Sequence, residues 1–184
     1  MLRARDVLLR AHDEADLPAI VEQGQDLDLQ RFTTIPVPYG PDDAAGFLDH
    51  VRSGWDDSRR AAWAIEAEGR FAGTVDLRFD TGWAAVGYGL HPWARGRGVM
   101  TTAVGLALDW AFTERAVVGV RWEALVGNGP SRRVAEKCGF TIEGTARGMS
   151  VARGVRHDAW TGSLLATEWR AQAGARWRRG TGLE

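Results

Sequence analysis

The chain has 184 residues, 45% of them hydrophobic and nine of them tryptophan, which is enough for one domain with a sizeable core. Its formal net charge of −1 excludes the strong positive field that draws proteins to nucleic acid or to anionic membranes. The single cysteine excludes an internal disulfide, and together with the lack of a signal core or a long apolar span it predicts a cytoplasmic protein.

Hydrophobic periodicity and turn residues predict the elements of the first half of the chain. A strand is expected at Val7–Ala11, and helices are expected at Glu14–Gln25 and Asp42–Arg52. Three antiparallel strands should follow, because short Gly-containing turns separate them. These strands are predicted at Ala62–Ala67, Phe71–Phe79 and Trp83–Leu90.

The second half alternates between helices and strands. A helix at about Met100–Phe112 should cross the sheet and lead to a strand at Val117–Val126. A short helix should begin near Pro130 and end before Gly139, since proline suits a first helical turn and glycine a left-handed C-terminus. A closing hairpin is expected at Thr145–Val151 and Val155–Leu165. We expect one domain over residues 1–168 and a basic tail over residues 169–184, which is either frayed or a short element that packs through Trp169 and Trp177.

The segment Arg95-Gly96-Arg97-Gly98-Val99-Met100 lies between a predicted strand and a predicted helix. Its glycines let the backbone approach an anion closely, and the N-terminus of the helix offers unpaired N–H groups to the same point. The arginines add charge, so such a cradle can bind a pyrophosphate without a metal ion. The segment lacks the Gly-Lys-Ser/Thr of a P-loop and the third glycine of a Rossmann fingerprint. Taken alone, it is more typical of an ordinary glycine-rich turn between a strand and a helix.

A second polar segment runs from Asn128 to Phe140 over the predicted short helix. Arg132, Arg133 and Lys137 lie on its basic face, where they could reach a phosphate. Asn128 and Ser131 follow the end of a strand and could bind a ligand, although Asn128 is as well suited to be an N-cap and Ser131 a first-turn helix residue.

The elements and motifs follow one another in the order strand, R-x-x-G-x-M, helix, strand, N-x-x-S, short helix and K-x-G-F. In this order the chain resembles the GNAT superfamily of acyl-CoA-dependent N-acetyltransferases over about residues 7–165. The segment Arg31–Tyr39 and the Gly87-Tyr88 pair resemble its ribosomal-protein N-terminal acetyltransferase branch. The resemblance implies an α/β (α+β) fold with a mixed, mostly antiparallel, twisted sheet that splays at its centre and carries helices on both faces. It also implies acetyl-CoA as co-substrate, without a metal, and leaves a homodimer open.

The resemblance implies roles for individual residues. The pantetheine arm should fill the gap beside Gly87–Leu90, where the two glycines suggest a bulge that frees a backbone N–H. That amide, at Gly89 or Leu90, should stabilise the oxyanion, and Ser131 should contact the leaving thiolate. The expected donor-binding residues are Tyr88, Gly89, Leu90, Arg95, Gly96, Arg97, Gly98, Val99, Met100, Asn128, Ser131, Arg132 and Lys137. Gly87 and Gly89 could instead merely make room for neighbouring tryptophans.

The general base is less clearly marked. Glu123 and Asp158 are the acids best placed by topology, but pairing with one of the many arginines is the more frequent role of any single carboxylate. Many relatives have glutamate where this chain has Ala85, which puts the acceptor chemistry in question. Cys138 falls on the apolar face at a helix C-terminus, where a thiol is poorly suited to act as a nucleophile.

We therefore expect direct acetyl transfer to a primary amine. A protein N-terminus is the first choice, a small-molecule amine such as an antibiotic or amino acid is the second, and a CoA-binding sensor without turnover is the alternative from another class. The loop at Pro36–Pro41 and the hairpin turn at Ala152–Gly154 should wall the acceptor side, which the first two predicted helices should flank.

Overall fold

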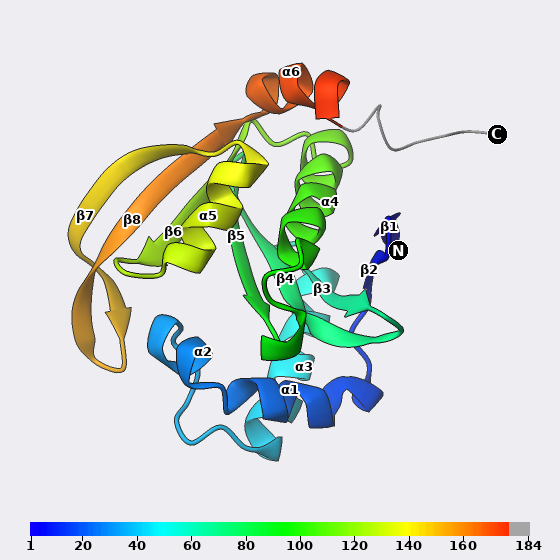
Figure 1. The fold of residues 1–184 in the computed structure, drawn as a ribbon, viewed down its shortest axis with the longest axis vertical. Helices are drawn as coiled ribbons and strands as arrows, with labels where there is room; N and C mark the ends of the chain where they lie inside the picture. The colour runs from blue at the N-terminus through cyan, green and yellow to red at the C-terminus, as the bar shows by residue number, and fades with distance from the viewer. Residues whose placement is uncertain (177–184) are drawn as a thin grey trace.

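The computed structural model describes the backbone of residues 1–176 and the side chains up to Ala171. Eight strands form one sheet in the order β1-β2-β3-β4-β5-β6-β8-β7 (Figure 1). Every neighbouring pair is antiparallel except β5 and β6, which are parallel. The predicted mixed, mostly antiparallel sheet is therefore confirmed.

The first half of the chain supplies strands β1–β5 and three helices on the way. The strands are β1 (Leu2–Ala4), β2 (Val7–Arg10), β3 (Arg60–Ala67), β4 (Arg70–Asp80) and β5 (Trp83–Leu90). The helices, preceded by the 3-10 turn η1 (Glu14–Asp16), are α1 (Leu17–Gly24), α2 (Leu27–Phe32) and α3 (Pro41–Asp56). Two-residue turns with positive φ join β3 to β4 at Glu68-Gly69 and β4 to β5 at Thr81-Gly82, as their sequences predict.

The second half supplies three more strands. It runs through the 3-10 turn η2 (Pro92–Ala94), α4 (Val99–Thr113), β6 (Gly119–Leu125), α5 (Gly129–Cys138), β7 (Thr141–Ala152), β8 (Val155–Leu165) and α6 (Ala166–Arg176). The β7–β8 hairpin projects from the body of the molecule (Figure 1). None of the helices in the described part of the chain combines the length and the apolar character that crossing a membrane requires.

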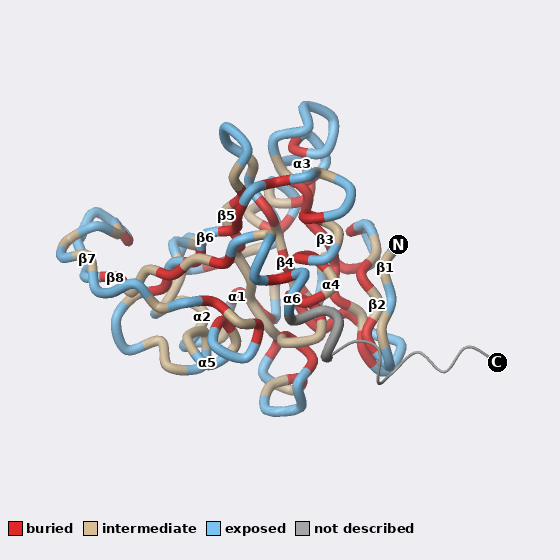
Figure 2. Tube along the Cα trace, turned by 90° about the horizontal axis from the view of Figure 1, so that it is seen from above, coloured by how far each residue is buried: buried red, intermediate tan, exposed pale blue. Residues whose placement is uncertain are grey.

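Helices pack on both faces of the sheet, and buried residues gather along its central strands (Figure 2). On one face, α4 and α5 pack through Ala103, Leu108 and Ala135 onto a core that includes Trp63 and Trp122. On the other face, α1 and α3 pack onto Ala62 and Ala64 of β3 in a smaller cluster. Because β3 is buried on both faces, its residues alternate between these two cores.

The sheet splays at its centre, between β5 and β6. The two strands pair from Trp83↔Gly119 to Val86↔Trp122 and no further. β6 continues to Leu125, but there its pairing partner is β8, while Gly87–Leu90 pair with β4. The last four residues of β5 therefore have an unpaired edge within the described sheet, which confirms the predicted gap.

Both readings of Gly87 and Gly89 that the sequence offered differ from the structure. The bulge expected at Gly87 and Gly89 is wrong, because β4 and β5 pair through Leu90 without a register shift. Register shifts lie instead between β3 and β4, at Ile65/Glu66, and between β7 and β8, at Ile142/Gly144 and Ala146/Ser150. The glycines do not accommodate tryptophans either: a Cβ at Gly87 would lie 2.4 Å from Oδ1 of Asp76, and one at Gly89 would lie 3.0 Å from Cδ1 of Leu29.

The predicted boundary at residue 168 falls inside α6. Trp169 is buried, with its ring 6.1 Å from that of Phe112, so this part of the expected tail packs on the core. Residues 177–184 of the expected tail lie outside the described part of the chain. Helix α2 and strand β1 were not expected.

Candidate functional site

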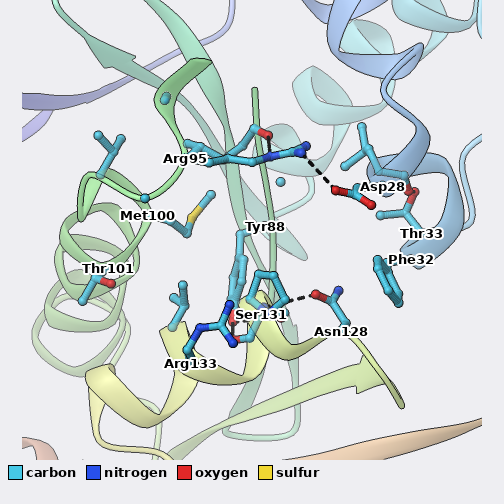
Figure 3. A pocket seen from close by; sticks show the side chains of 18 of the residues that line it. Asp28, Phe32, Thr33, Tyr88, Arg95, Met100, Thr101, Asn128, Ser131 and Arg133 are labelled. Carbon is cyan, nitrogen blue, oxygen red and sulfur yellow. Dashed lines mark hydrogen bonds and ion pairs between the residues drawn. The ribbon is translucent and has the colours of Figure 1, made fainter. Parts of the chain in front are cut away.

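A cavity of about 580 Å³ opens where β5 and β6 separate. Figure 3 shows Asp28 and Phe32 of α2 and the following Thr33 on one side and Met100 and Thr101 of α4 on the other, with Tyr88 and Ser131 between them. The residues that line it are Asp28, Leu29, Arg31, Phe32, Thr33, Tyr88, Gly89, Leu90, Ala94, Arg95, Gly96, Gly98, Val99, Met100, Thr101, Gly127, Asn128, Pro130, Ser131, Arg133, Val134 and Lys137. The two motif segments of the sequence thus meet in one cavity.

The glycine-rich loop presents its backbone to this cavity. Gly96 and Gly98 adopt φ values of +77° and +81°, a left-handed conformation that glycine adopts without strain. A Cβ at either glycine would meet no atom within 4 Å, so both face open space. Gly98 is the N-cap of α4, whose first backbone N–H groups have no partner within the helix. The loop and the helix end together can receive an anion.

The open edge of β5 supplies a second set of backbone groups. The N–H of His91 donates to the carbonyl of Ala72 on β4 at 2.8 Å. Because successive backbone groups of a strand point to opposite sides, the N–H of Leu90 points away from β4, toward the gap. Of the two amides considered from the sequence, Leu90 therefore faces the gap and Gly89 faces β4. The free amide results from the separation of the strands and not from a bulge.

Tyr88 and Ser131 form a hydrogen-bonded pair at the base of the cavity. The Tyr88 hydroxyl donates to the Ser131 carbonyl at 2.9 Å, and the Ser131 hydroxyl donates to the Tyr88 oxygen at 3.2 Å. Nε1 of Trp122 donates to Ser131 Oγ at 3.1 Å. Burial raises the pKa of the Tyr88 phenol well above its usual range, so Tyr88 stays protonated. A protonated phenol next to the Ser131 hydroxyl can hold a proton close to the cavity.

Asn128 combines the two roles that its sequence position left open. Its side-chain oxygen accepts a hydrogen bond from the Ser131 N–H at 3.1 Å, so it is the N-cap of α5. The same residue lines the cavity. Asn128 fixes the first turn of α5 and thereby the position of Ser131.

The two loop arginines do not point into the cradle. Arg97 forms an ion pair with Glu68 on the exposed β3–β4 turn and is not among the lining residues. Arg95 lines the cavity, but its guanidinium is bound to Asp26. Burial raises the pKa of Asp26, but the hydrogen bonds from Arg95 and from the Leu29 N–H outweigh it and lower that pKa below its usual range.

On α5 the basic residues divide between the cavity and the surface. Arg132 forms an ion pair with Glu136 at 2.8 Å and lies 5.0 Å over the Trp160 ring, outside the lining. Arg133 and Lys137 line the cavity. The structure thus places Arg133, which the sequence suggested only as one basic residue among three, where Arg132 was expected.

Neither acid considered as a base lines the cavity. Glu123 is exposed on β6, and Asp158 accepts a hydrogen bond from the Gly148 N–H at 2.8 Å within the projecting hairpin. Asp28 of α2, which the sequence did not single out, is the carboxylate among the lining residues. Ala85, where many relatives have glutamate, pairs with Arg78 on β4.

The segments expected to wall or flank the acceptor side do not line this cavity. Neither the Pro36–Pro41 loop nor the Ala152–Gly154 turn is among the lining residues, and neither α1 nor α3 contributes to them. Helix α2, which was not expected, lines the cavity, and Arg153 of the hairpin turn donates to the Thr33 carbonyl at 3.3 Å. The residue that could have indicated α2 in the sequence is Asp26, because aspartate is a common N-cap. In the structure Asp26 caps α2 by accepting a hydrogen bond from the Leu29 N–H.

The Cys138 thiol has the surroundings of a core residue and not those of a nucleophile. Cys138 is buried on α5, with its sulfur 3.6 Å from the Thr101 carbonyl, and it does not line the cavity. Among the described residues, no three His, Cys, Asp or Glu side chains gather into a group that could hold a metal ion.

Comparison with known proteins gives independent information. A family model described as an acetyltransferase (GNAT) domain matches residues 6–141. YdaF of Bacillus subtilis (strain 168), whose name marks it provisionally as a ribosomal N-acetyltransferase, is 37% identical over 89 residues, which are 48% of this chain and 49% of YdaF. The chain spans about half the length of the curated relatives it matches.

Solved structures extend the likeness to nearly the whole fold. A crystal structure of a probable acetyltransferase is 26% identical with a TM-score of 0.81, covering 90% of this chain and 96% of that one. RimL, a ribosomal L7/L12 α-N-protein acetyltransferase in complex with coenzyme A, has a TM-score of 0.81 at 19% identity, covering 90% of this chain and 97% of that one.

Proposed function

The chain belongs to the GNAT acetyltransferase family, and we propose that it transfers an acetyl group from acetyl-CoA to a primary amine, by direct attack in a ternary complex. A protein or peptide N-terminal α-amine is the first choice of acceptor. The observation that carries the proposal is one cavity that joins an anion cradle, an unpaired strand edge and a half-buried hydroxyl pair.

The donor half of the proposal rests on the loop and on α5. The pyrophosphate would lie against the backbone of Gly96–Met100, since a helix N-terminus and two open glycines suit an anion. Arg133 and Lys137 would add positive charge from the facing wall. The pantetheine arm would follow the open edge of β5 and take the place of the missing strand pairing. RimL, a neighbour in fold, holds coenzyme A in its structure.

The transfer step follows from the groups that face the gap. The amine nitrogen attacks the thioester carbon, a C–N bond forms, the C–S bond breaks, and CoA leaves as a thiol. The Leu90 N–H would donate to the carbonyl oxygen as negative charge develops there. The Ser131 hydroxyl, which lies between Tyr88 and Trp122, would turn its O–H from the Tyr88 oxygen to the sulfur and hydrogen-bond or protonate the leaving thiolate, and the proton released by the amine would restore the hydroxyl or the thiol.

The acceptor would enter beside α2. Asp28 would hold the amine as it loses its proton, because it is the carboxylate of the described lining and Glu123 and Asp158 lie elsewhere. An α-amine has an ordinary pKa of about 8, so about a tenth of it is neutral at pH 7 and a weak base suffices. The buried position of Cys138 supports direct attack over an acetyl-enzyme.

The choice of an N-terminal acceptor is supported by what two similar proteins are called. YdaF is named provisionally as a ribosomal N-acetyltransferase, and RimL is described as an α-N-protein acetyltransferase. The second candidate is a small-molecule amine. A donor-binding sensor without turnover would have the same cradle but no need of an ordered Ser131 hydroxyl. A cytoplasmic location and a homodimer stay predictions.

A competition assay tests the acceptor. The protein is incubated with acetyl-CoA and an equimolar mixture of peptides with small N-terminal residues, free lysine and aminoglycosides, and products are mapped by mass spectrometry. We expect acetylation of the peptide α-amines first. Preferred turnover of a small amine, or modification confined to lysine side chains, would reject the N-terminal acceptor. Slow CoA release with every amine would instead favour the sensor.

A further inference from the structure

The Arg95 side chain leaves the glycine loop and extends toward α2 (Figure 3). Its Nε donates to the Leu90 carbonyl at 3.1 Å, and its terminal nitrogens reach the carboxylate of Asp26 and, at 3.5 Å, that of Asp28. The side chains of Arg95 and Asp26 are 35% and 14% exposed, so the contact is partly shielded from solvent. All three nitrogens of the guanidinium are thus occupied by groups other than a phosphate.

Each partner of Arg95 belongs to a different half of the site. Leu90 ends β5, and its backbone faces the gap proposed for the thioester. Asp26 caps α2, because it also accepts from the Leu29 N–H at 2.9 Å. Asp28 lies in the first turn of α2 and lines the cavity. The guanidinium therefore joins the end of the strand to the helix beside which the acceptor is proposed to enter.

Apart from Arg95, helix α2 is held by contacts at its margins: Leu29 lies beside Gly89, Gln30 Nε2 donates to the Gly24 carbonyl at 3.0 Å, and Arg153 donates to the Thr33 carbonyl just after the helix. The helix is six residues long and none of its residues is buried, so neither its length nor its packing fixes its position strongly. A planar guanidinium with donors on several edges can bind a carbonyl and two carboxylates at once, which an ammonium group on a flexible stem does less well.

We propose that Arg95 is a positioning residue for acetyl transfer. It holds α2, and with it Asp28, at a fixed place relative to the Leu90 backbone, and it contributes little to donor binding. This inference rests on the proposed function, since it assumes that α2 binds the acceptor. It assigns Arg95 a role different from the phosphate contact that the sequence suggested.

The test uses Arg95→Gln, Arg95→Lys and Asp26→Asn in the full chain. Asparagine is also a good N-cap, so Asp26→Asn removes the charge and keeps the cap. Arg52→Gln is the matched control, because Arg52 forms an exposed ion pair with Glu14 of η1 at 3.6 Å, away from the cavity. Three quantities are measured: the acetyl-CoA Kd by calorimetry, kcat and acceptor KM by thiol release, and hydrogen exchange of the α2 amides without ligand.

For Arg95→Gln we expect an acetyl-CoA Kd within about twofold of wild type and a fall of about tenfold or more in kcat/KM for the acceptor, because misplacement of a substrate wall has effects of this size. The α2 amides should exchange faster. Arg95→Lys should recover part of the loss, and adding Asp26→Asn to Arg95→Gln should change little, because both changes break the same contact. Arg52→Gln should behave as wild type.

Two results would overturn the proposal. If Arg95→Gln weakens acetyl-CoA binding as much as it lowers kcat/KM, then Arg95 is a donor ligand. If the α2 amides exchange at the wild-type rate, then Arg95 does not hold the helix. The exchange measurement needs no acceptor, so it decides the positioning role even if the wild-type protein acetylates no amine and the proposed function fails.

Discussion

At the scale of single residues, neighbouring groups fix where each polar side chain of the site lies: Tyr88 and Trp122 hold the Ser131 hydroxyl, and Asp26 holds the Arg95 guanidinium. Ser131 and Asn128 were singled out from N-x-x-S, and the structure brings both to the cavity. Arg95, Arg97 and Arg132 were expected to bind phosphate as a group, but each has a carboxylate partner, on Asp26, Glu68 and Glu136 respectively. Two of those partners are distant in sequence, so no local pattern could indicate which way the arginines point.

The Tyr88–Ser131 pair leads to a prediction about single side chains. Ser131→Ala should lower kcat by about 10²-fold with a smaller change in acetyl-CoA KM, because a contact to the leaving group strengthens in the transition state. Asn128→Ala should raise the acetyl-CoA KM and, because Asn128 caps the turn that carries Ser131, lower kcat by less than Ser131→Ala does. Steady-state kinetics with varied acetyl-CoA distinguish the two. Equal effects of both variants on KM alone would reduce Ser131 to a binding residue.

At the scale of elements, strong apolar periodicity made the predictions reliable and its absence made them fail. β5 was predicted with its observed bounds, and α4 to within a residue at each end. Helix α2 was missed because it has no buried residue and so no apolar face to detect. The open edge of β5 was inferred from the resemblance, since local sequence does not specify where a parallel partner stops pairing.

The loop before α4 gives a prediction for this element. Acetyl-CoA should raise the Tm of the wild-type protein by mass action, and a chelator should not change that shift. Gly98→Val should abolish the shift, because a branched side chain would fill the open space at Gly98 and its φ of +81° disfavours any residue except glycine. Differential scanning fluorimetry measures this, with the Tm of each unliganded protein as reference. An unchanged shift in Gly98→Val would show that the cradle is not at this loop.

At the scale of the whole molecule, the fold class followed from the order of elements and from the resemblance, and the solved structures confirm it. Two cores stabilise the sheet, and a polar side chain is buried beside the smaller one. This side chain is His12: its Nε2 lies 3.0 Å from Thr74 Oγ1, and its ring packs against Phe47 and Phe71. No periodicity argument could predict such a buried histidine.

His12 makes global stability depend on pH. Burial lowers its pKa from 6.5 to about 4, so between these values the unfolded chain binds more protons than the folded one. The stabilisation is complete above pH 6.5 and is lost as the pH falls toward 4, by up to about 3 kcal/mol. Urea unfolding at several pH values should give a shallower decline for His12→Gln than for wild type over this range. Parallel declines would contradict the assignment to His12.

The central claim is that the donor lies along the open edge of β5, and a crystal structure with acetyl-CoA tests it most directly. We predict the thioester oxygen about 2.7–3.2 Å from the Leu90 nitrogen, as in an ordinary N–H···O hydrogen bond, with the pyrophosphate against the Gly96–Met100 backbone and the sulfur beside Ser131. A donor bound away from this cavity, or a thioester oxygen pointing away from the Leu90 amide, would contradict the account.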